Sequence, residues 1–360
     1  MAPVLDFTSA LYLGLRHPSQ SLRAWSALTT GKPAALEPPA SALVVARQLA
    51  ALQGCEHATL LPSTLHLFWD LCGLLAREQV RIYMDAGAYA VGRWGVERAA
   101  AQGVPVRSFP HHDAAAAHVL IERDRRSARR PIIIADGFCP TCASAAPLAQ
   151  LLQSVEPYGG ELIIDDTQAL GVFGAPSADA PYGRGGGGSL PWHGVASPRV
   201  IAGSSLAKGF GVPMAVLSGS RRVIHRFEEC SETRLHSSPT SLAVLRAAEH
   251  ALAVNCRQGD RLRLYLLHLV ERFRAGLRQI GLTARGGLFP VQVLSLKGIH
   301  APALHLRLLG LGIRTILVRC CRGLGTCLGF LITALHRPAD IDCAIEALDR
   351  LIVRHPARIS

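Results

Sequence analysis

Short apolar runs alternate along this chain with longer segments in which apolar residues recur at helical spacing. The segment 41–54 shows the helical pattern, with Ser41 as the expected N-cap and Gly54 as the stop signal. Regular alternation of strand-like and helix-like patterns predicts an α/β fold. The strands expected in the first 220 residues begin near Ala58 and then occupy 80–85, 103–109, 130–135, 162–164, 200–202 and 212–219.

Two features of the second half lead to further structural predictions. The periodicity predicts two separate long helices, Leu242–Val254 and Arg261–Ile280, followed by strands at Val291–Leu294 and Leu328–Thr333. The four-glycine run that begins at Gly185 is interpreted as a flexible surface loop, because it lacks the strand–GxGxxG–helix setting of a dinucleotide-binding fingerprint.

The candidate chemistry lies in the middle of the chain. The apolar strand 162–164 is followed at once by Asp165 and Asp166, at the strand end where ligands bind in an open α/β sheet. A later apolar strand runs into a turn of small residues that holds Lys208. A lysine that forms a Schiff base and an aspartate that partners the pyridinium nitrogen are the groups that pyridoxal phosphate requires.

Lysine is rare in this chain, which makes Lys208 informative. The other lysines are Lys32 and Lys297, while arginine supplies the remaining positive side chains. Because arginine stays protonated, a lysine kept among Gly, Ser and Ala indicates an amine that can lose its proton. A surface lysine in a loop is the alternative, and Asp165 with Gln168 and Ser205 argue against it.

Several motifs resemble those of the α-oxoamine synthases, a family that includes 8-amino-7-oxononanoate synthase and 2-amino-3-ketobutyrate CoA ligase. The segment ELIIDDTQALGVFG, from Glu161, is similar to their VDDAHGTGVLG, and GSSLAKGFGV, from Gly203, is similar to TFGKGFGV. Residues 182–185 resemble the GRG loop. The resemblance begins at residues 11–15, similar to part of NDYLGL, and continues to residues 336–341, similar to H-T-x-E-D-I.

The resemblance implies the aspartate aminotransferase-like fold of the fold-type I pyridoxal phosphate enzymes. That fold has a large domain with a mostly parallel sheet and a small α+β C-terminal domain. We expect an N-terminal arm at 1–40, the cofactor-binding domain at 41–255 and the small domain at 256–360. Residues 231–239 are similar to a segment that reaches the phosphate of the neighbouring subunit, which implies a homodimer with shared active sites, expected in the cytoplasm.

The resemblance also assigns a role to each candidate site residue. Lys208 is the catalytic residue, and Asp165 faces the ring nitrogen. The strand-to-helix turn near residue 63 offers free N–H groups to a phosphate. The remaining cofactor contacts are Ser63, Thr64 and Leu65 at the phosphate, Ser205 before the lysine, Tyr89 stacked on the ring, Gln168 at the phenolic oxygen, and His236 and Ser237 from the partner subunit. Arg319 and Arg322 would bind the substrate carboxylate.

The implied reaction is decarboxylative condensation of an amino acid with an acyl thioester of CoA or acyl-carrier protein. Several positions depart from the family pattern: Tyr89 and Gln168 replace histidines, Pro140 replaces a serine, and the Arg-Leu-Arg before His336 is here Cys-Leu-Gly, from Cys327. These departures leave two alternatives open. One is an aminotransferase, and the other is a non-catalytic dimer that keeps the fold as a binding scaffold.

Composition adds few constraints. The net charge of +12 raises nucleic acid as a partner, but the arginines are dispersed and match no nucleic-acid module, so none is expected. No apolar run reaches the length of a membrane span, no signal peptide is predicted, and the ten cysteines suit a reducing compartment.

Two short motifs suggest metal or redox chemistry. Cys139–Cys142 reads CPTC, a redox motif in a thioredoxin-like context, but here it stands where the family has the FSMDGD turn. A zinc site would need a second cysteine pair, and Cys320-Cys321 has the wrong spacing. His111–Asp113 reads HHD and is interpreted as a solvated turn, so no metal is predicted.

Overall fold

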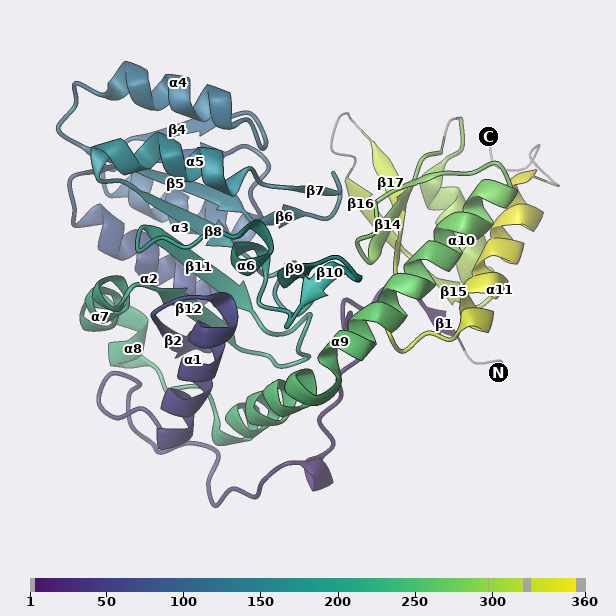
Figure 1. Cartoon of the computed structure of the whole chain (residues 1–360), viewed down its shortest axis with the longest axis horizontal. Coiled ribbons are helices and arrows are strands. Elements are labelled where there is room, and N and C mark those ends of the chain that lie inside the picture. The colour runs from purple at the N-terminus through teal and green to yellow at the C-terminus, as the bar shows by residue number, and fades with distance from the viewer. Residues whose placement is uncertain (1–3, 297, 320–324, 354–360) are drawn as a thin grey trace. The chain divides into compact units, whose positions relative to one another are not determined.

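A computed structural model of the chain describes residues 4–296, 298–319 and 325–353 (Figure 1). The described residues form two compact units. The smaller unit contains the residues up to Leu15, the segment Cys139–Ser144 and the residues from Gln258 onward. The larger unit contains Arg16–Phe138 and Ala145–Arg257. The domain limits expected at residues 40 and 255 stay a prediction.

A seven-stranded sheet forms the centre of the larger unit. Its strand order is β2-β12-β11-β8-β5-β3-β4, and every neighbouring pair is parallel except the two that involve β12. The mostly parallel sheet agrees with the α/β prediction. The strands are β2 (His57–Leu61), β3 (Val80–Asp85), β4 (Val106–Phe109), β5 (Arg130–Asp136), β8 (Glu161–Asp165), β11 (Val200–Ser205) and β12 (Ala215–Gly219).

Helices cover both faces of this sheet, so its central strands are apolar on both sides (Figure 1). Residues such as Ile134, Ile163 and Ile201 pack with α2, α3 and α7 on one face, whereas Leu162 and Ile164 pack with α4, α5 and α6 on the other. The helices of the larger unit are α1 (Ala40–Gln53), α2 (Thr64–Ala76), α3 (Ala90–Ala101), α4 (Ala114–Asp124), α5 (Leu148–Val155), α6 (Ser189–His193), α7 (Arg221–Cys230) and α8 (Glu232–His236).

The ends of α1 show one correct and one wrong prediction. Gly54 ends the helix in the left-handed conformation, with φ of 69°, as a C-terminal glycine should. The helix begins one residue before the expected cap, because Pro39 is the N-cap and its carbonyl accepts the N–H of Ala42. The prediction that Ser41 caps the helix is therefore wrong.

The two long helices predicted near the C-terminus are one continuous helix, α9 (Leu242–Gln279). The segment 255–260 suggested a break because it contains Asn255 and Gly259, which are poor helix formers. Side-chain contacts stabilise the helix across this segment. Asn255 donates to the carbonyl of Gly185, and the buried Arg263 bonds Asp260 one helical turn away. Although α9 is long, neither it nor any other helix in the described part of the chain is long and apolar enough to span a bilayer.

The glycine run 185–188 is mostly buried, so its interpretation as a flexible surface loop is wrong. Its backbone bonds directly to the segment that follows β8: Gly186 accepts the N–H of Gly171, and Gly188 donates to Phe173. A side chain at Gly187 would clash with the backbone carbonyl of Leu52. The glycines are therefore required by close backbone packing.

The smaller unit contains an antiparallel sheet of order β13-β14-β17-β16 and a parallel pair, β1 with β15. The strands expected at 291–294 and 328–333 are both present, the second shifted by two residues. The elements are β1 (Leu5–Asp6), β13 (Ala284–Arg285), β14 (Val291–Leu294), β15 (Ile313–Arg314), β16 (Ile316–Arg319), β17 (Thr326–Leu331), α10 (Ala301–Gly310), α11 (Pro338–Leu348) and the second part of α9.

Candidate active site

Two carboxylates lie side by side at the carboxyl end of the parallel sheet. Asp136 ends β5 and pairs in register with Asp165, which ends β8, and Asp165 in turn pairs with Gly203 of β11. Side chains alternate between the faces of a strand, so Asp136 and Asp165 share the face of Ile134 and Ile163, against which α2 packs. The ladder thus sets both acids on one face, beside the strand that leads to Lys208.

Lys208 lies in the turn that follows β11, and this turn packs directly against the loop that follows β8. The contact is made by two glycines, because a Cβ on Gly171 would lie 2.8 Å from the Cα of Gly209. Burial lowers the pKa of Lys208, while the carboxylates of Asp165 and Asp136 oppose that shift. The geometry therefore brings together a partly desolvated amine and two acids, as the prediction for Lys208 and Asp165 requires.

The adjacent aspartates of β8 have different environments. Asp165 Oδ1 accepts the N–H of Thr167 at 3.0 Å, and burial raises its pKa against the opposing effects of Thr167 and Lys208. Asp166 points to the other face, where its Oδ2 accepts the N–H of Ser189 at 2.8 Å. Burial raises the pKa of Asp166 to about 7. Of these two aspartates, Asp165 interacts electrostatically with Lys208, whereas Asp166 bonds the start of α6.

Thr167 connects the acid to the lysine turn. Its N–H donates to Asp165, and its hydroxyl oxygen accepts the N–H of Ser205 at 2.9 Å. The Ser205 hydroxyl accepts the N–H of Ala207 at 3.2 Å, which shapes the turn one residue before Lys208. Thr167 and its role were not predicted from the sequence.

Asp136 is a second site residue that the sequence analysis missed. Its carboxylate accepts the backbone N–H of Tyr89 at 3.1 Å, and Tyr89 is the N-cap of α3. Tyr89 is 59% exposed, and its ring centroid lies 6.0 Å from Lys208 Nζ. The structure thus places the predicted ring-stacking residue beside the amine, and Asp136 holds its backbone there.

The strand-to-helix turn predicted to hold a phosphate is present. β2 ends at Leu61, and α2 begins at Thr64 with Ser63 as its N-cap. The first turn of α2 contains no acidic residue, so its N–H groups and its dipole favour an anion. The Ser63 hydroxyl lies 2.8 Å from Nδ1 of His66, a residue not singled out in the sequence. Because Gly203 has no side chain, Leu67 of α2 packs closely against β11 below the site.

For the other predicted residues the structure gives burial and local hydrogen bonds, and their roles stay predictions. Gln168 is half-buried in the turn after Asp165. His236 is exposed at the end of α8, and the Ser237 hydroxyl donates to the carbonyl of Thr233 at 2.5 Å. Arg319 is exposed at the end of β16, whereas Arg322 lies outside the described residues.

The HHD turn is not simply solvated, which corrects the interpretation of His111 and His112. Both histidines are half-buried, and Nδ1 of His111 lies 2.7 Å from Asp85 Oδ1. The other Asp85 oxygen accepts the backbone N–H of His112, and Gly87 donates to Oδ1. Burial lowers the pKa of His112 to about 4. Asp85 thus ties the turn at residue 111 to the loop that leads to Tyr89.

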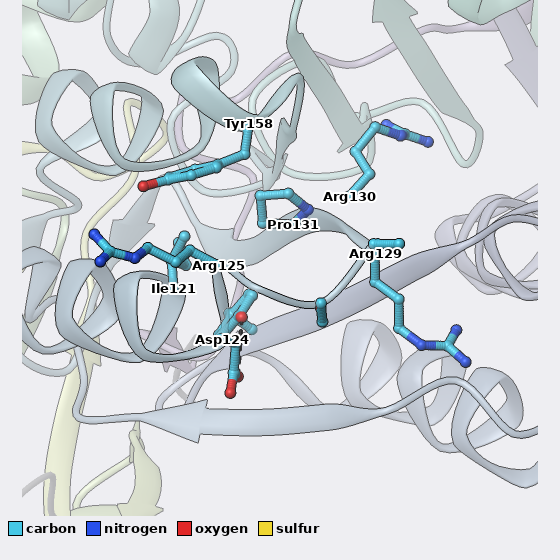
Figure 2. Close-up of a pocket in the computed structure, with 10 residues that line it drawn as sticks. Ile121, Asp124, Arg125, Arg129, Arg130, Pro131 and Tyr158 are labelled. Atoms are coloured by element: carbon cyan, nitrogen blue, oxygen red, sulfur yellow. Dashed lines mark hydrogen bonds between the residues drawn. The ribbon is translucent and has the colours of Figure 1, made fainter.

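An open pocket of about 270 Å³ lies at the amino end of β5, away from the strand ends that carry the aspartates (Figure 2). It surrounds the start of β5, with Arg129, Arg130 and Pro131 on one side and Tyr158 on the other. Its polar groups have partners: Tyr83 donates to Asp124, and Arg130 pairs with Glu78 and Glu161. Ligands of parallel sheets bind at the carboxyl ends of strands, so this pocket is not the candidate site.

The chain is similar to known proteins in sequence and in fold. The family model for aminotransferases of class I and II matches residues 26–348. The 8-amino-7-oxononanoate synthase of Halorhodospira halophila is 32% identical over 227 residues, which are 61% of this chain and 54% of that protein. The corresponding protein of Alcanivorax borkumensis is 28% identical over 249 residues, 68% and 61% of the two chains. The chain spans less than two thirds of the length of these relatives.

Solved structures resemble the fold over nearly its whole length. Serine palmitoyltransferase of Sphingomonas wittichii has a TM-score of 0.83 at 17% identity and covers 99% of this chain and 89% of its own. The 8-amino-7-oxononanoate synthase of Francisella tularensis has a TM-score of 0.75 at 17% identity, covering 98% of each chain. The predicted fold class is therefore confirmed.

Proposed function

The chain belongs to the aminotransferase class I and II family, and from this premise we propose that it is a pyridoxal-phosphate-dependent transferase. The reaction we propose is the decarboxylative condensation of an amino acid with an acyl thioester. The observation that carries the proposal is the Lys208 amine, partly desolvated beside the carboxylates of Asp165 and Asp136. The similarity to proteins named 8-amino-7-oxononanoate synthase supports the reaction class.

The residues at the site fit this cofactor by the chemistry of their donors. Lys208 would hold it through its aldehyde, and Asp165 would pair with the ring nitrogen. The acid-free first turn of α2, with Ser63, Thr64 and Leu65, would hold the phosphate. The other contacts would come from Ser205 at the phosphate, Tyr89 over the ring and Gln168 at the phenolic oxygen.

When bound, the cofactor supplies a sink for the electrons released at the α-carbon of the amino acid. The lowered pKa of Lys208 favours its neutral amine, which takes the proton from that carbon as general base. Burial raises the pKa of Asp165, and the N–H of Thr167 and the facing Lys208 oppose that rise and so favour the charged carboxylate. Asp136 fixes the backbone of Tyr89 and so positions the ring beside the amine.

The substrates would be an amino acid and an acyl-CoA or acyl-carrier-protein thioester. Arg319 or Arg322 would bind the amino-acid carboxylate in place of the family arginine, since paired guanidinium–carboxylate bonds give geometric selectivity. We also propose a homodimer in which His236 and Ser237 of one subunit complete the phosphate site of the other. We place the enzyme in the cytoplasm, where its cysteines stay mainly reduced.

Absorption spectroscopy tests the cofactor proposal directly. Purified protein mixed with pyridoxal phosphate should show a visible band that disappears in Lys208→Ala, while Lys32→Ala, an exposed lysine, keeps it. The reaction is tested by release of free thiol from acyl-CoA and acyl-carrier-protein donors across a panel of amino acids. Release of a keto acid with no thiol would identify an aminotransferase, and a colourless protein unaffected by the loss of Lys208 would leave only a binding scaffold.

A further inference from the structure

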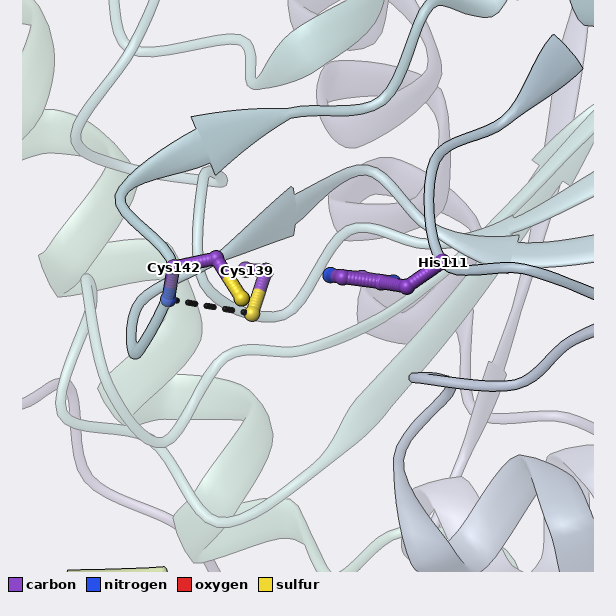
Figure 3. A group of neighbouring side chains, drawn as sticks. All are labelled: His111, Cys139 and Cys142. Atoms are coloured by element: carbon purple, nitrogen blue, oxygen red, sulfur yellow. Dashed lines mark hydrogen bonds between the residues drawn. The ribbon is translucent and has the colours of Figure 1, made fainter. Parts of the chain in front are cut away.

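The hairpin that follows β5 places two thiols side by side. Its strands, β6 (Phe138–Cys139) and β7 (Ser144–Ala145), pair with each other, and the turn between them carries Cys142. The sulfur atoms of Cys139 and Cys142 lie within 4.8 Å of each other (Figure 3). Residues i and i+3 of a tight turn have Cα atoms less than about 7 Å apart, which is close to the range that a disulfide spans. The two sulfurs can therefore bond without unfolding the hairpin.

The two thiols differ in a way that suits a reacting pair. The N–H of Cys142 donates to Cys139 Sγ at 3.4 Å (Figure 3). The hydroxyl of Thr141, which can donate or accept, lies 3.3 Å from the same sulfur. Hydrogen bonds to a sulfur favour its thiolate, as in other CxxC motifs. Cys139 is buried, whereas Cys142 is only half-buried. An external reagent thus reaches Cys142 first and leaves Cys139 as the resolving thiolate.

We propose that Cys139 and Cys142 are a reversible dithiol–disulfide modification site. The thiolate of Cys142 attacks a low-molecular-weight disulfide, forms a mixed disulfide and releases one thiol. The thiolate of Cys139 then attacks Cys142 Sγ and releases the second thiol. Two protein thiols are oxidised, one external disulfide is reduced to two thiols, and no other reagent is consumed.

The base of the hairpin connects this site to the sheet. Gly137 donates its N–H to the carbonyl of Asp165 at 2.9 Å and accepts the N–H of Ala146 at 3.0 Å. In the turn, Ala143 has φ of 56°, a conformation that alanine rarely adopts. A disulfide between residues 139 and 142 would close a short ring next to this unfavourable residue, while the base stays bonded to β8. Oxidation is thus confined to the tip of the hairpin.

The test uses the full chain equilibrated in mixtures of oxidised and reduced glutathione. Thiols are then blocked, and the tryptic peptide that carries both cysteines and no other is weighed. We expect this peptide to convert in one step, reversibly on reduction, from a form with two blocking groups to a form with none that is two hydrogens lighter than the unblocked dithiol. Cys256, exposed and distant in sequence, serves as the internal control and should carry only bound glutathione. A peptide that stays reduced, or that also carries only glutathione, would overturn the proposal.

Two further measurements keep the result independent of folding defects. Cys139→Ser should leave Cys142 trapped with glutathione, whereas Cys142→Ser, at the more exposed position, should protect Cys139 from modification; circular dichroism checks that both variants fold. The reduced wild-type chain should also bind one phenylarsine oxide across the two sulfurs with loss of water, and neither variant should. Equal binding by wild type and both variants would contradict the pairing.

Discussion

At the scale of single residues, adjacent positions of one strand have opposite environments. Asp165 meets the lysine turn and the N–H of Thr167, whereas Asp166 is enclosed on the other face with Ser189. Asp166 Oδ1 accepts no hydrogen bond from the described part of the chain, and burial raises the pKa of this side chain to about 7. The folded state therefore favours the protonated form of Asp166 at pH values below about 7.

This proton predicts a pH dependence of stability. Between pH 4 and pH 7 the folded chain keeps the Asp166 proton, while the unfolded chain releases it. The contribution of Asp166 to the free energy of unfolding should fall across this window, by up to about 4 kcal/mol, and level off above it. In Asp166→Asn this fall should be absent in urea denaturation followed at several pH values.

The matched control is Asp342→Asn. The Arg272 guanidinium lowers the pKa of Asp342, so the stability from this pair is lost only as the pH falls below about 4. Comparing each variant with the wild type cancels the histidine contributions that they share. Parallel wild-type and Asp166→Asn curves between pH 4 and pH 7 would contradict the assignment.

The hydroxyl of Thr167 gives a second prediction at this scale. Thr167→Val keeps the shape of the side chain but leaves the half-buried N–H of Ser205 without its acceptor. We expect the free energy of unfolding to fall by about 1–2 kcal/mol, measured by urea denaturation. Thr167→Ser keeps the hydroxyl and should stay close to wild type; equal losses in both variants would assign the effect to packing.

How far sequence alone reaches can be judged from these residues. Asp165 is predictable because it directly follows an apolar run, and Lys208 because it lies in a small-residue turn after another such run in a chain with few lysines. Asp136 and Thr167 are not, because their roles depend on strand register and on a hydrogen bond between residues 38 positions apart. The burial of His111 has the same origin, since its partner Asp85 ends a strand 26 residues earlier.

At the scale of elements, close backbone packing joins the loops around the site. The loop after β8 contacts the lysine turn at Gly171 and Gly209, and it bonds the glycine run at Gly186 and Gly188. Helix ends and continuity are less predictable than strands here. Pro39 takes over the cap from Ser41, and α9 continues through Gly259 because tertiary contacts outweigh local propensity.

The glycine run provides the prediction for this scale. In Gly187→Ala the added methyl group would meet the backbone of Leu52, which cannot move aside as a side chain would. We expect a loss of at least about 1–3 kcal/mol in the free energy of unfolding. Gly310→Ala, at the end of α10, adds the same methyl group in open space and should be neutral. Thermal or urea denaturation of the pair measures the difference.

At the scale of the whole molecule, the proposed dimer determines which residues make up a site. Lys208 belongs to the larger unit, and the exposed His236 would act on the phosphate of the other subunit. If the sites are shared, two subunits with different inactivating substitutions can together form one intact site. A monomer with a complete site of its own cannot be rescued in this way.

Hybrid dimers test this prediction. Lys208→Ala and His236→Ala should each be inactive or impaired alone. After unfolding and refolding together in equal amounts, half of the dimers are mixed and one of their two sites is intact, so about a quarter of wild-type activity should return. Light scattering should give the mass of a dimer throughout. No recovery in a refolded mixture, with wild type refolded alongside as control, would contradict shared sites.

The in-register pairing of β5, β8 and β11 has a consequence for the history of this protein. Main-chain hydrogen bonds fix the spacing of Asp136, Asp165 and the strand that precedes Lys208, and they do so whatever side chains surround them. Proposed cofactor contacts such as Tyr89 and Gln168 can therefore change without moving these strand ends. Binding of pyridoxal phosphate and choice of substrate can evolve separately, so single substitutions can change the substrate specificity of this fold.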